Sequence, residues 1–153
     1  MPVPWNSERA GARRSRLCRK PFGRFAKAER GESGLITVSG GVQAALEGLG
    51  VCVRHAYSQS WSEFPAIVWR ESGNYVCAMA DAEEYLAEVE YETDVYAFSQ
   101  AETEAISKQI DAKMAEMALK RTYSAELFEA DTRLHHRVLK YRGRADASGN
   151  IYQ

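Results

Sequence analysis

The chain has 153 residues, of which 45% are hydrophobic and 27% charged, and its formal net charge at pH 7 is −1. This length fits one ordinary domain with its own hydrophobic core, and the composition is typical of a globular protein. No stretch approaches the roughly 18 consecutive apolar residues of a membrane-spanning helix, so we expect no membrane segment.

The first 33 residues differ in charge from the rest. Residues 1–33 contain seven Arg and two Lys but three Glu, whereas the remaining residues are acidic overall. They show no helical or strand periodicity and no apolar stretch typical of a secretory signal, so we expect a flexible, poorly ordered basic arm. It either contacts nucleic acid or a partner, or it is an inert tail. The candidate contact residues are Arg13, Arg14, Arg16, Arg19 and Lys20.

A short helix and a strand are expected next. Ser39 is a suitable N-cap, apolar residues recur at helical spacing from Val42 to Leu49, and Gly50 suits a left-handed helix stop. Residues 51–57 then have the composition of a strand. Trp61 follows in a polar loop, where it either contacts a partner or folds back and is buried.

Residues 65–81 are predicted to form a β-hairpin. The segment opens with Pro65, and Ser72–Gly73–Asn74 provides turn-forming residues between two apolar runs. We therefore expect two short antiparallel strands with the turn at residues 72–74.

The segment from residue 85 to residue 98 alternates acidic and apolar residues. In a strand, successive side chains point to opposite faces, so one face of this strand is apolar and the other is acidic. We call the four carboxylates on the acidic face the acidic comb. They are Glu88, Glu90, Glu92 and Asp94.

A capping box then predicts the longest helix. Ser99 and Glu102 have the spacing with which a serine and a glutamate satisfy free backbone N–H groups at a helix start. Apolar residues recur every three or four positions from Ile106 to Met117, so the helix is expected over residues 100–119.

The C-terminal part is less regular. Residues 120–135 are ambiguous, residues 136–145 form a strand whose mixed pattern suits a sheet edge, and residues 146–153 are expected to fray. Basic residues gather in this part as interface candidates. They are Arg121, Arg133, Arg137, Lys140, Arg142 and Arg144.

Together these elements predict an α+β fold. We expect a single domain over residues 34–145, with a small antiparallel β-sheet of about four to five strands, and one short and one long helix packed on one face. The acidic comb then lies on the open face or at an edge.

No pattern in the sequence indicates catalysis. There is no Gly-x-Ser-x-Gly motif and no phosphate-binding loop. Carboxylates on alternate strand positions lie about 6.5 to 7 Å apart, too far to surround one metal ion, although two of them could form an acid pair for glycoside cleavage. Cys18, Cys52 and Cys77 lack the spacing of a zinc site and suit reduced core cysteines. We expect no enzyme, no catalytic residue, no metal and no cofactor.

The order of the pieces resembles a known group of proteins. A short helix precedes GVCVRHAYSQSWSEFPAIVWRESGNYVCAMAD, then YLAEVEYETDVYAFS runs directly into QAETEAISKQIDAKMAEMAL, and a final strand follows Asp131, His135 and His136. In this order and pattern, residues 38–142 resemble the head-to-tail joining and tail-completion proteins of long-tailed bacteriophages, a group that includes tail terminators. The basic arm departs from that pattern.

The resemblance implies a structural virion protein assembled in the host cytoplasm. Such proteins form a ring, commonly a hexamer, at the neck or tail end, contact neck or tail-tube proteins, and let the genomic DNA pass without sequence specificity. The acidic comb would then face the lumen, a neighbouring subunit's basic residues, or solvent. The alternative is a small nucleic-acid-binding or regulatory protein that uses the basic arm.

Overall fold

The computed structural model of the protein describes residues 34–55 and 63–153. The candidate contact residues of the basic arm and Trp61 lie outside this part of the chain.

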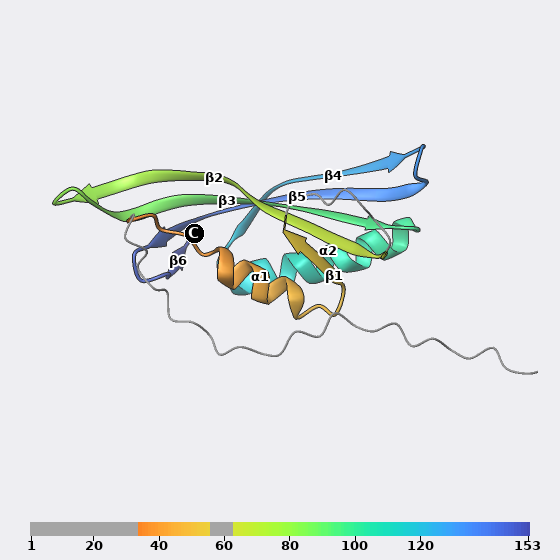
Figure 1. Cartoon of the computed structure of the whole chain (residues 1–153), viewed down its shortest axis with the longest axis horizontal. Coiled ribbons are helices and arrows are strands. Elements are labelled where there is room, and N and C mark those ends of the chain that lie inside the picture. Colours follow the sequence, from red (N-terminus) through yellow and green to blue (C-terminus); the bar gives the residue numbers. More distant parts are fainter. Residues whose placement is uncertain (1–33, 56–62) are drawn as a thin grey trace, which may run out of the picture.

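One twisted sheet organises the described residues (Figure 1). Its strand order is β1-β2-β3-β5-β4, and β6 pairs with the end of β5. β1 is parallel to β2 and all other pairs are antiparallel, so the expected α+β fold with a mainly antiparallel sheet is confirmed. The elements are α1 (Ser39–Glu47), β1 (Cys52–His55), β2 (Ala66–Ala80), β3 (Glu83–Ala97), α2 (Gln100–Glu116), β4 (Lys120–Glu129), β5 (Leu134–Asp146) and β6 (Ile151–Tyr152).

Both helices lie on the same side of the sheet, as expected (Figure 1). The core forms between them and the apolar face of the central strands, where Trp69, Tyr91 and Tyr141 are the largest fully buried side chains. The predicted role of Ser99 as the N-cap of α2 is confirmed, because the Ser99 hydroxyl accepts a hydrogen bond from the Glu102 backbone N–H at 3.3 Å. This cap and the buried apolar stripe explain why the longest helix starts here.

The expected N-cap of α1 is wrong. Val38 occupies the N-cap position without a side-chain bond, and Ser39 is already helical. The Ser39 hydroxyl instead lies 3.2 Å from the Tyr91 hydroxyl and 3.4 Å from Glu71 Oε2, so it links the helix start to the sheet. Gly50 does adopt the expected left-handed conformation, with φ of 71°.

The predicted hairpin within residues 65–81 is also wrong. β2 continues through Ser72–Gly73–Asn74 as one strand, with an irregularity in its register between Glu71 and Gly73. The chain reverses later, at Asp81 and Ala82, which have φ of 51° and 65°. Two successive left-handed residues make the tight turn that suits a twisted hairpin, and alanine is an unusual residue for this conformation.

The C-terminal elements correct two further expectations. The ambiguous segment forms β4, and β5 lies between β3 and β4 rather than at an edge. Residues 146–153 are held rather than frayed, because the Asp146 carboxylate accepts hydrogen bonds from the Ser148 N–H at 2.8 Å, the Asn150 N–H at 3.0 Å and the Tyr152 hydroxyl at 2.7 Å. These bonds fold a tight turn that brings β6 back to β5.

The β2–β3 hairpin extends far beyond the helices. Gly73, Glu90, Arg142 and Lys120 lie in one row across the four main strands. β4 starts at this row and runs toward one end of the sheet, whereas residues 74–89 project toward the other end (Figure 1). We call residues 74–89 the β2–β3 wing.

Candidate functional site

The acidic comb lies on the sheet face opposite the helices. Its four carboxylates share one side of β3, as the alternation predicts, while Val89, Tyr91 and Val95 enter the core. The comb is not an open row of acids, however. Basic residues of the two flanking strands lie beside it in the same chain.

Glu92 lies between two cations from different strands. Arg70 of β2 and Lys140 of β5 are its neighbours in the sheet register. The Arg70 guanidinium forms an ion pair with Glu92 Oε1, and Lys140 Nζ lies 2.9 Å from Glu92 Oε2. The Glu92 side chain is 8% exposed, so its charge depends on these partners rather than on water.

Asp94 is buried more deeply and faces a histidine. His136 Nε2 lies 2.9 Å from Asp94 Oδ1, and Arg70 Nη1 lies 3.6 Å from Asp94 Oδ2. The His136 ring stacks on Tyr96 with centroids 4.2 Å apart, and its Nδ1 lies 3.4 Å from Glu129 Oε1 of β4. A carboxylate, an imidazole and a second carboxylate therefore link three strands.

The other two carboxylates of the comb share one arginine. Arg142 of β5 forms an ion pair with Glu88, and its Nε lies 3.7 Å from Glu90 Oε1. The hydrogen bond that the Arg142 guanidinium donates to Glu88 is the main cause that raises the pKa of Arg142. These two acids are more exposed than Glu92 and Asp94, with side-chain exposures of 16% and 35%.

Cross-strand pairing within one chain thus compensates the charge of the comb. We call Arg70, His136, Lys140 and Arg142, together with the comb, the charge ladder. Two of the basic interface candidates, Lys140 and Arg142, lie directly beside Glu92 and Glu90 of the same chain, because the antiparallel register pairs these residues. The face that carries the comb is therefore a mixture of acidic and basic side chains rather than a row of acids alone.

A cationic notch lies where β4 begins and β6 ends. Basic side chains from β4 and β5 surround a hollow of about 670 Å³, with Glu88 and Tyr152 at its margin. Gly143 lies at its base, where a side chain would come within 2.9 Å of Leu119 and Ile151. The four basic residues of the cationic notch are Lys120, Arg121, Arg142 and Arg144.

Two of these cations are available for a partner. Arg121 Nη1 lies 3.4 Å from Asp111 of α2, and Arg142 is held by Glu88. Lys120 and Arg144 are exposed and have no ion-pair partner among residues 34–55 and 63–153. The notch can therefore accept carboxylates or another anion.

The remaining predicted basic residues lie elsewhere. Arg137 of β5 pairs with Glu126 of β4 at 2.5 Å. Arg133 lies in the turn between β4 and β5, with φ of 58°. The structure therefore divides the expected basic cluster between the charge ladder, the notch and the β4–β5 hairpin.

Two long strand edges have no neighbour within the described part of the chain. β1 pairs with residues 66–69 of β2, and no described residue pairs with the outer edge of residues 71–80. β4 has an open edge along its whole length and is exposed at every residue except Ala125 and Glu129, which are partly buried. Unpaired N–H and C=O groups of this kind readily pair with another strand.

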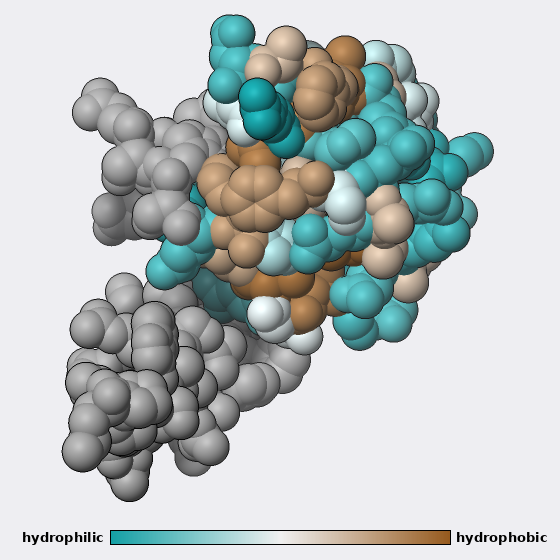
Figure 2. All heavy atoms as spheres, turned by 90° about the vertical axis from the view of Figure 1, so that its right-hand side faces the viewer, coloured by the Kyte–Doolittle hydropathy of each residue, from teal (hydrophilic) through white to brown (hydrophobic). Residues whose placement is uncertain are grey.

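Large apolar side chains are exposed beside both open edges. Tyr75, Val76 and Met79 are exposed by 53%, 59% and 58% on the β2–β3 wing. Tyr123, Leu127 and Phe128 are exposed on β4. Figure 2 views the molecule from the end at which β4 finishes, and apolar side chains gather there within a hydrophilic surround. Such patches are typical of interaction surfaces.

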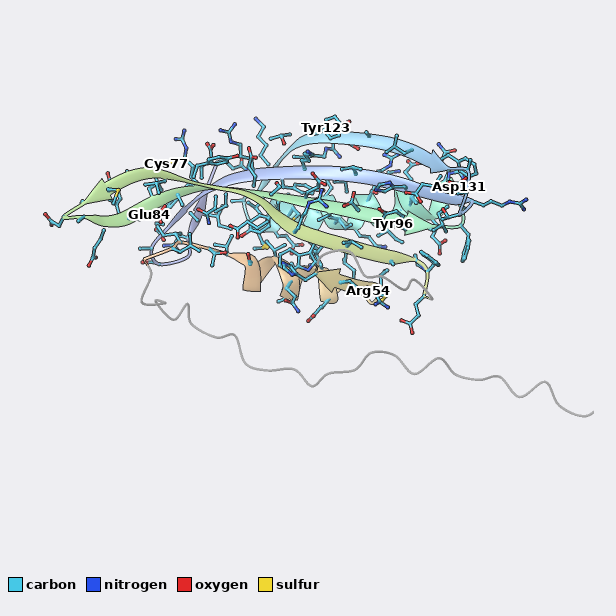
Figure 3. All side chains as sticks on the ribbon, turned by 45° about the horizontal axis from the view of Figure 1, so that its top comes forward. Arg54, Cys77, Glu84, Tyr96, Tyr123 and Asp131 are labelled. Atoms are coloured by element: carbon cyan, nitrogen blue, oxygen red, sulfur yellow. The ribbon has the colours of Figure 1, made fainter. Side chains whose placement is uncertain are left out.

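The cysteines differ in their surroundings. Cys77 is exposed on β2 and Cys52 is partly buried on β1, and both have free thiols. The expectation of core cysteines is wrong for Cys77, because the β2–β3 wing extends beyond the helices that would cover it (Figure 3).

Within residues 34–55 and 63–153 there is no cluster of three or more His, Cys, Asp or Glu side chains placed to hold a metal ion. The same residues contain no helix that is long and apolar enough to cross a membrane. No protein-family model matches the chain, and no curated protein is significantly similar to it.

The sequence interpretation missed some members of these sites. Arg70 belongs to the charge ladder, and Lys120 to the notch. A single strand pattern gives no register, so the partners of the comb could not be chosen. The signal that was available is the second alternation, in which Lys140, Arg142 and Arg144 occupy every second position of β5 just as the acids do on β3.

Proposed function

We propose that this chain is a non-enzymatic structural protein of a tailed bacteriophage. In this proposal it forms a ring at the neck or tail end, where it joins the tail to the head or terminates the tail tube, and DNA passes through the ring. The resemblance in element order introduces this function, and the sheet edges support it.

The observation that carries the proposal is the pair of open edges on opposite sides of one sheet. Because the two edges differ, contact between them is heterologous, and a heterologous contact repeats from copy to copy until it closes into a ring or continues as a filament. Exposed apolar residues beside both edges supply surface that a subunit contact would bury.

The charge ladder is compatible with a structural role. Its acids and bases satisfy one another within the chain and stiffen the open face, which leaves few charged groups free to bind or transform a small substrate. A ring built from these sheets would present this compensated face, rather than a strongly charged one, toward passing DNA or toward solvent.

The experiment measures assembly directly. The molar mass of the purified protein is measured by light scattering, and the particles are imaged by electron microscopy. Both measurements are made on the protein alone and on its mixtures with phage tail tubes or neck complexes. We expect closed rings with a mass near six subunits, in solution or on the tube end. A protein that stays monomeric in every mixture would contradict the proposal.

A pair of variants tests whether the exposed apolar patch of the β2–β3 wing is needed for ring formation. Met79→Glu places a charge in the exposed apolar patch of the β2–β3 wing and should prevent ring formation. Leu35→Glu changes an equally exposed apolar residue before α1, outside both edges, and should leave ring formation intact.

A further inference from the structure

We propose that β4 of one copy pairs antiparallel with residues 71–80 of β2 in the next copy. In this arrangement the acidic tip of the β2–β3 wing enters the cationic notch of its neighbour. The acidic tip is the turn region that carries Asp81, Glu83 and Glu84. This inference rests on the proposed ring and specifies the contact that builds it.

The two edges match in length and accessibility. β4 offers the ten residues Lys120–Glu129, and the open part of β2 offers the ten residues from 71 to 80. None of these residues is fully buried within one copy. Backbone hydrogen bonds along such a length can join two sheets without any change of fold.

The strand directions also fit. β2 runs antiparallel to β3, β3 to β5, and β5 to β4, so β4 and β2 run in opposite directions in one chain. Placing the next copy beside β4 in the same orientation therefore makes an antiparallel pair, and all helices stay on one side of the extended sheet. The wing projects past the start of β4, so the neighbour lies shifted along the strand direction, from the row in which Gly73 is level with Lys120 to one in which Ala80 faces Lys120 (Figure 1).

Charge complementarity determines which ends meet. In the antiparallel pair, the start of β4 lies beside the end of the neighbour's β2. The cationic notch at Lys120 and Arg144 then faces Asp81 and Glu83 of the neighbour, and all four residues are exposed. Opposite charges at this position favour one register over its alternatives.

Apolar side chains meet further along the pair. With Ala80 opposite Lys120, the exposed Val76 and Cys77 of the wing lie near Tyr123 and Ser124 of the neighbour. Each of these side chains is exposed in a single copy, so the contact buries apolar surface that is now in water. Figure 3 shows Cys77 on the wing and Tyr123 on β4, well separated within one chain.

The native Cys77 provides a direct test of the register. In a chain with Cys18→Ala and Cys52→Ala, a second cysteine is introduced as Tyr123→Cys or, separately, Ser124→Cys. Directly opposed residues of an antiparallel pair bring their Cβ atoms within about 5.5 Å, which suits a disulfide. Mild oxidation of the assembled protein should give a ladder of cross-linked copies on a non-reducing gel from at least one variant. The matched control Gln109→Cys, exposed on α2, should stay uncross-linked.

Charge-reversal variants test whether the acidic tip of one copy contacts the cationic notch of the next. Lys120→Glu with Arg144→Glu should weaken assembly at least tenfold, as should Asp81→Lys with Glu83→Lys. Mixing these two variants should restore assembly as rings in which the variants alternate, because the reversed notch of one then faces the reversed tip of the other, and the native notch of the second faces the native tip of the first. Loss through misfolding would not be restored by mixing, so this recovery separates the contact from a folding defect.

The outcomes also separate this inference from the proposed function. In one outcome, rings form although Cys77 cross-links to neither β4 cysteine and both charge reversals are tolerated. This result would overturn the proposed edge pairing but not the proposed ring. Cross-linking of Cys77 to a tail-tube protein instead of a second copy would overturn it as well. A chain that forms no ring under any condition would overturn both.

Discussion

Asp94 and His136 face each other inside the sheet, with Oδ1 and Nε2 2.9 Å apart and both residues almost fully shielded from water. They lie one step apart diagonally across β3 and β5, on the face opposite the helices. A polar pair at this depth is costly to break because the remaining partner stays buried without compensation.

We predict that Asp94→Ala destabilises the protein by about 3 kcal/mol, since it leaves His136 and Arg70 without this carboxylate. Urea unfolding followed by circular dichroism measures the change. Glu104→Ala is the control, because Glu104 forms an exposed pair with Lys108 on α2, and its loss should cost far less than the loss of Asp94. Equal losses in the two variants would contradict the importance of the buried pair.

Two neighbouring acids of the comb should respond very differently to charge reversal. Glu92→Lys brings a third cation between Arg70 and Lys140 at a site that is 8% exposed, so we expect a loss of about 3 kcal/mol or more, or failure to fold. Glu90→Lys acts at a side chain that is 35% exposed and has one distant partner, Arg142, so its cost should stay near about 1 kcal/mol. Thermal melts of both variants provide the comparison, and a milder effect at Glu92 would disprove our account of the charge ladder.

The sequence predicts the elements of this fold better than their arrangement. The acid-apolar alternation of β3 and the Ser99 cap of α2 depend on residues within one element, and both are confirmed. The turn at Asp81–Ala82 was missed because alanine carries no preference for the left-handed conformation it adopts. The Ser72–Gly73–Asn74 segment has turn-forming residues, yet pairing with β3 on the other side keeps it extended.

The charge ladder needs information that no single strand contains. That Glu92 lies beside Arg70 and Lys140 depends on the register of three strands from distant parts of the sequence. The mixed pattern of β5 predicts an edge strand because its apolar and basic residues do not segregate cleanly between the two faces. In the structure its basic side chains pair with the acids of β3, so a central strand can carry them.

Tyr91 joins the sheet to the start of α1 through its hydroxyl group. A substitution by phenylalanine removes this hydroxyl and keeps the aromatic ring. The hydroxyl accepts the Val38 N–H at 3.3 Å, and burial raises its pKa. Tyr91→Phe leaves that N–H without its partner, so we expect a loss of about 1 kcal/mol and faster amide exchange at Val38. The comparison is Tyr141→Phe, whose hydroxyl donates to Asp111 at 3.3 Å and contacts no helix start. This variant should leave exchange at Val38 unchanged, and acceleration in both would indicate general loosening instead.

The C-terminal turn should open in acid because of Asp146. Hydrogen bonds from the Asn150 side chain, the Tyr152 hydroxyl and the Asn150 and Ser148 N–H groups lower the pKa of this carboxyl from 3.8 to about 2. The folded-state pKa is lower than the unfolded one, so the stabilisation is present above pH 3.8 and is lost as the pH falls through about 2. We expect the amide of Tyr152, which lies in a hydrogen-bonded pair with Arg144, to lose exchange protection between these pH values while the β3 amides keep theirs. In Asp146→Ala the Tyr152 amide should already be unprotected at pH 7 and show no such transition. If β6 in the unchanged chain stayed protected at pH 2, the Asp146 carboxylate would not be what holds this strand in place.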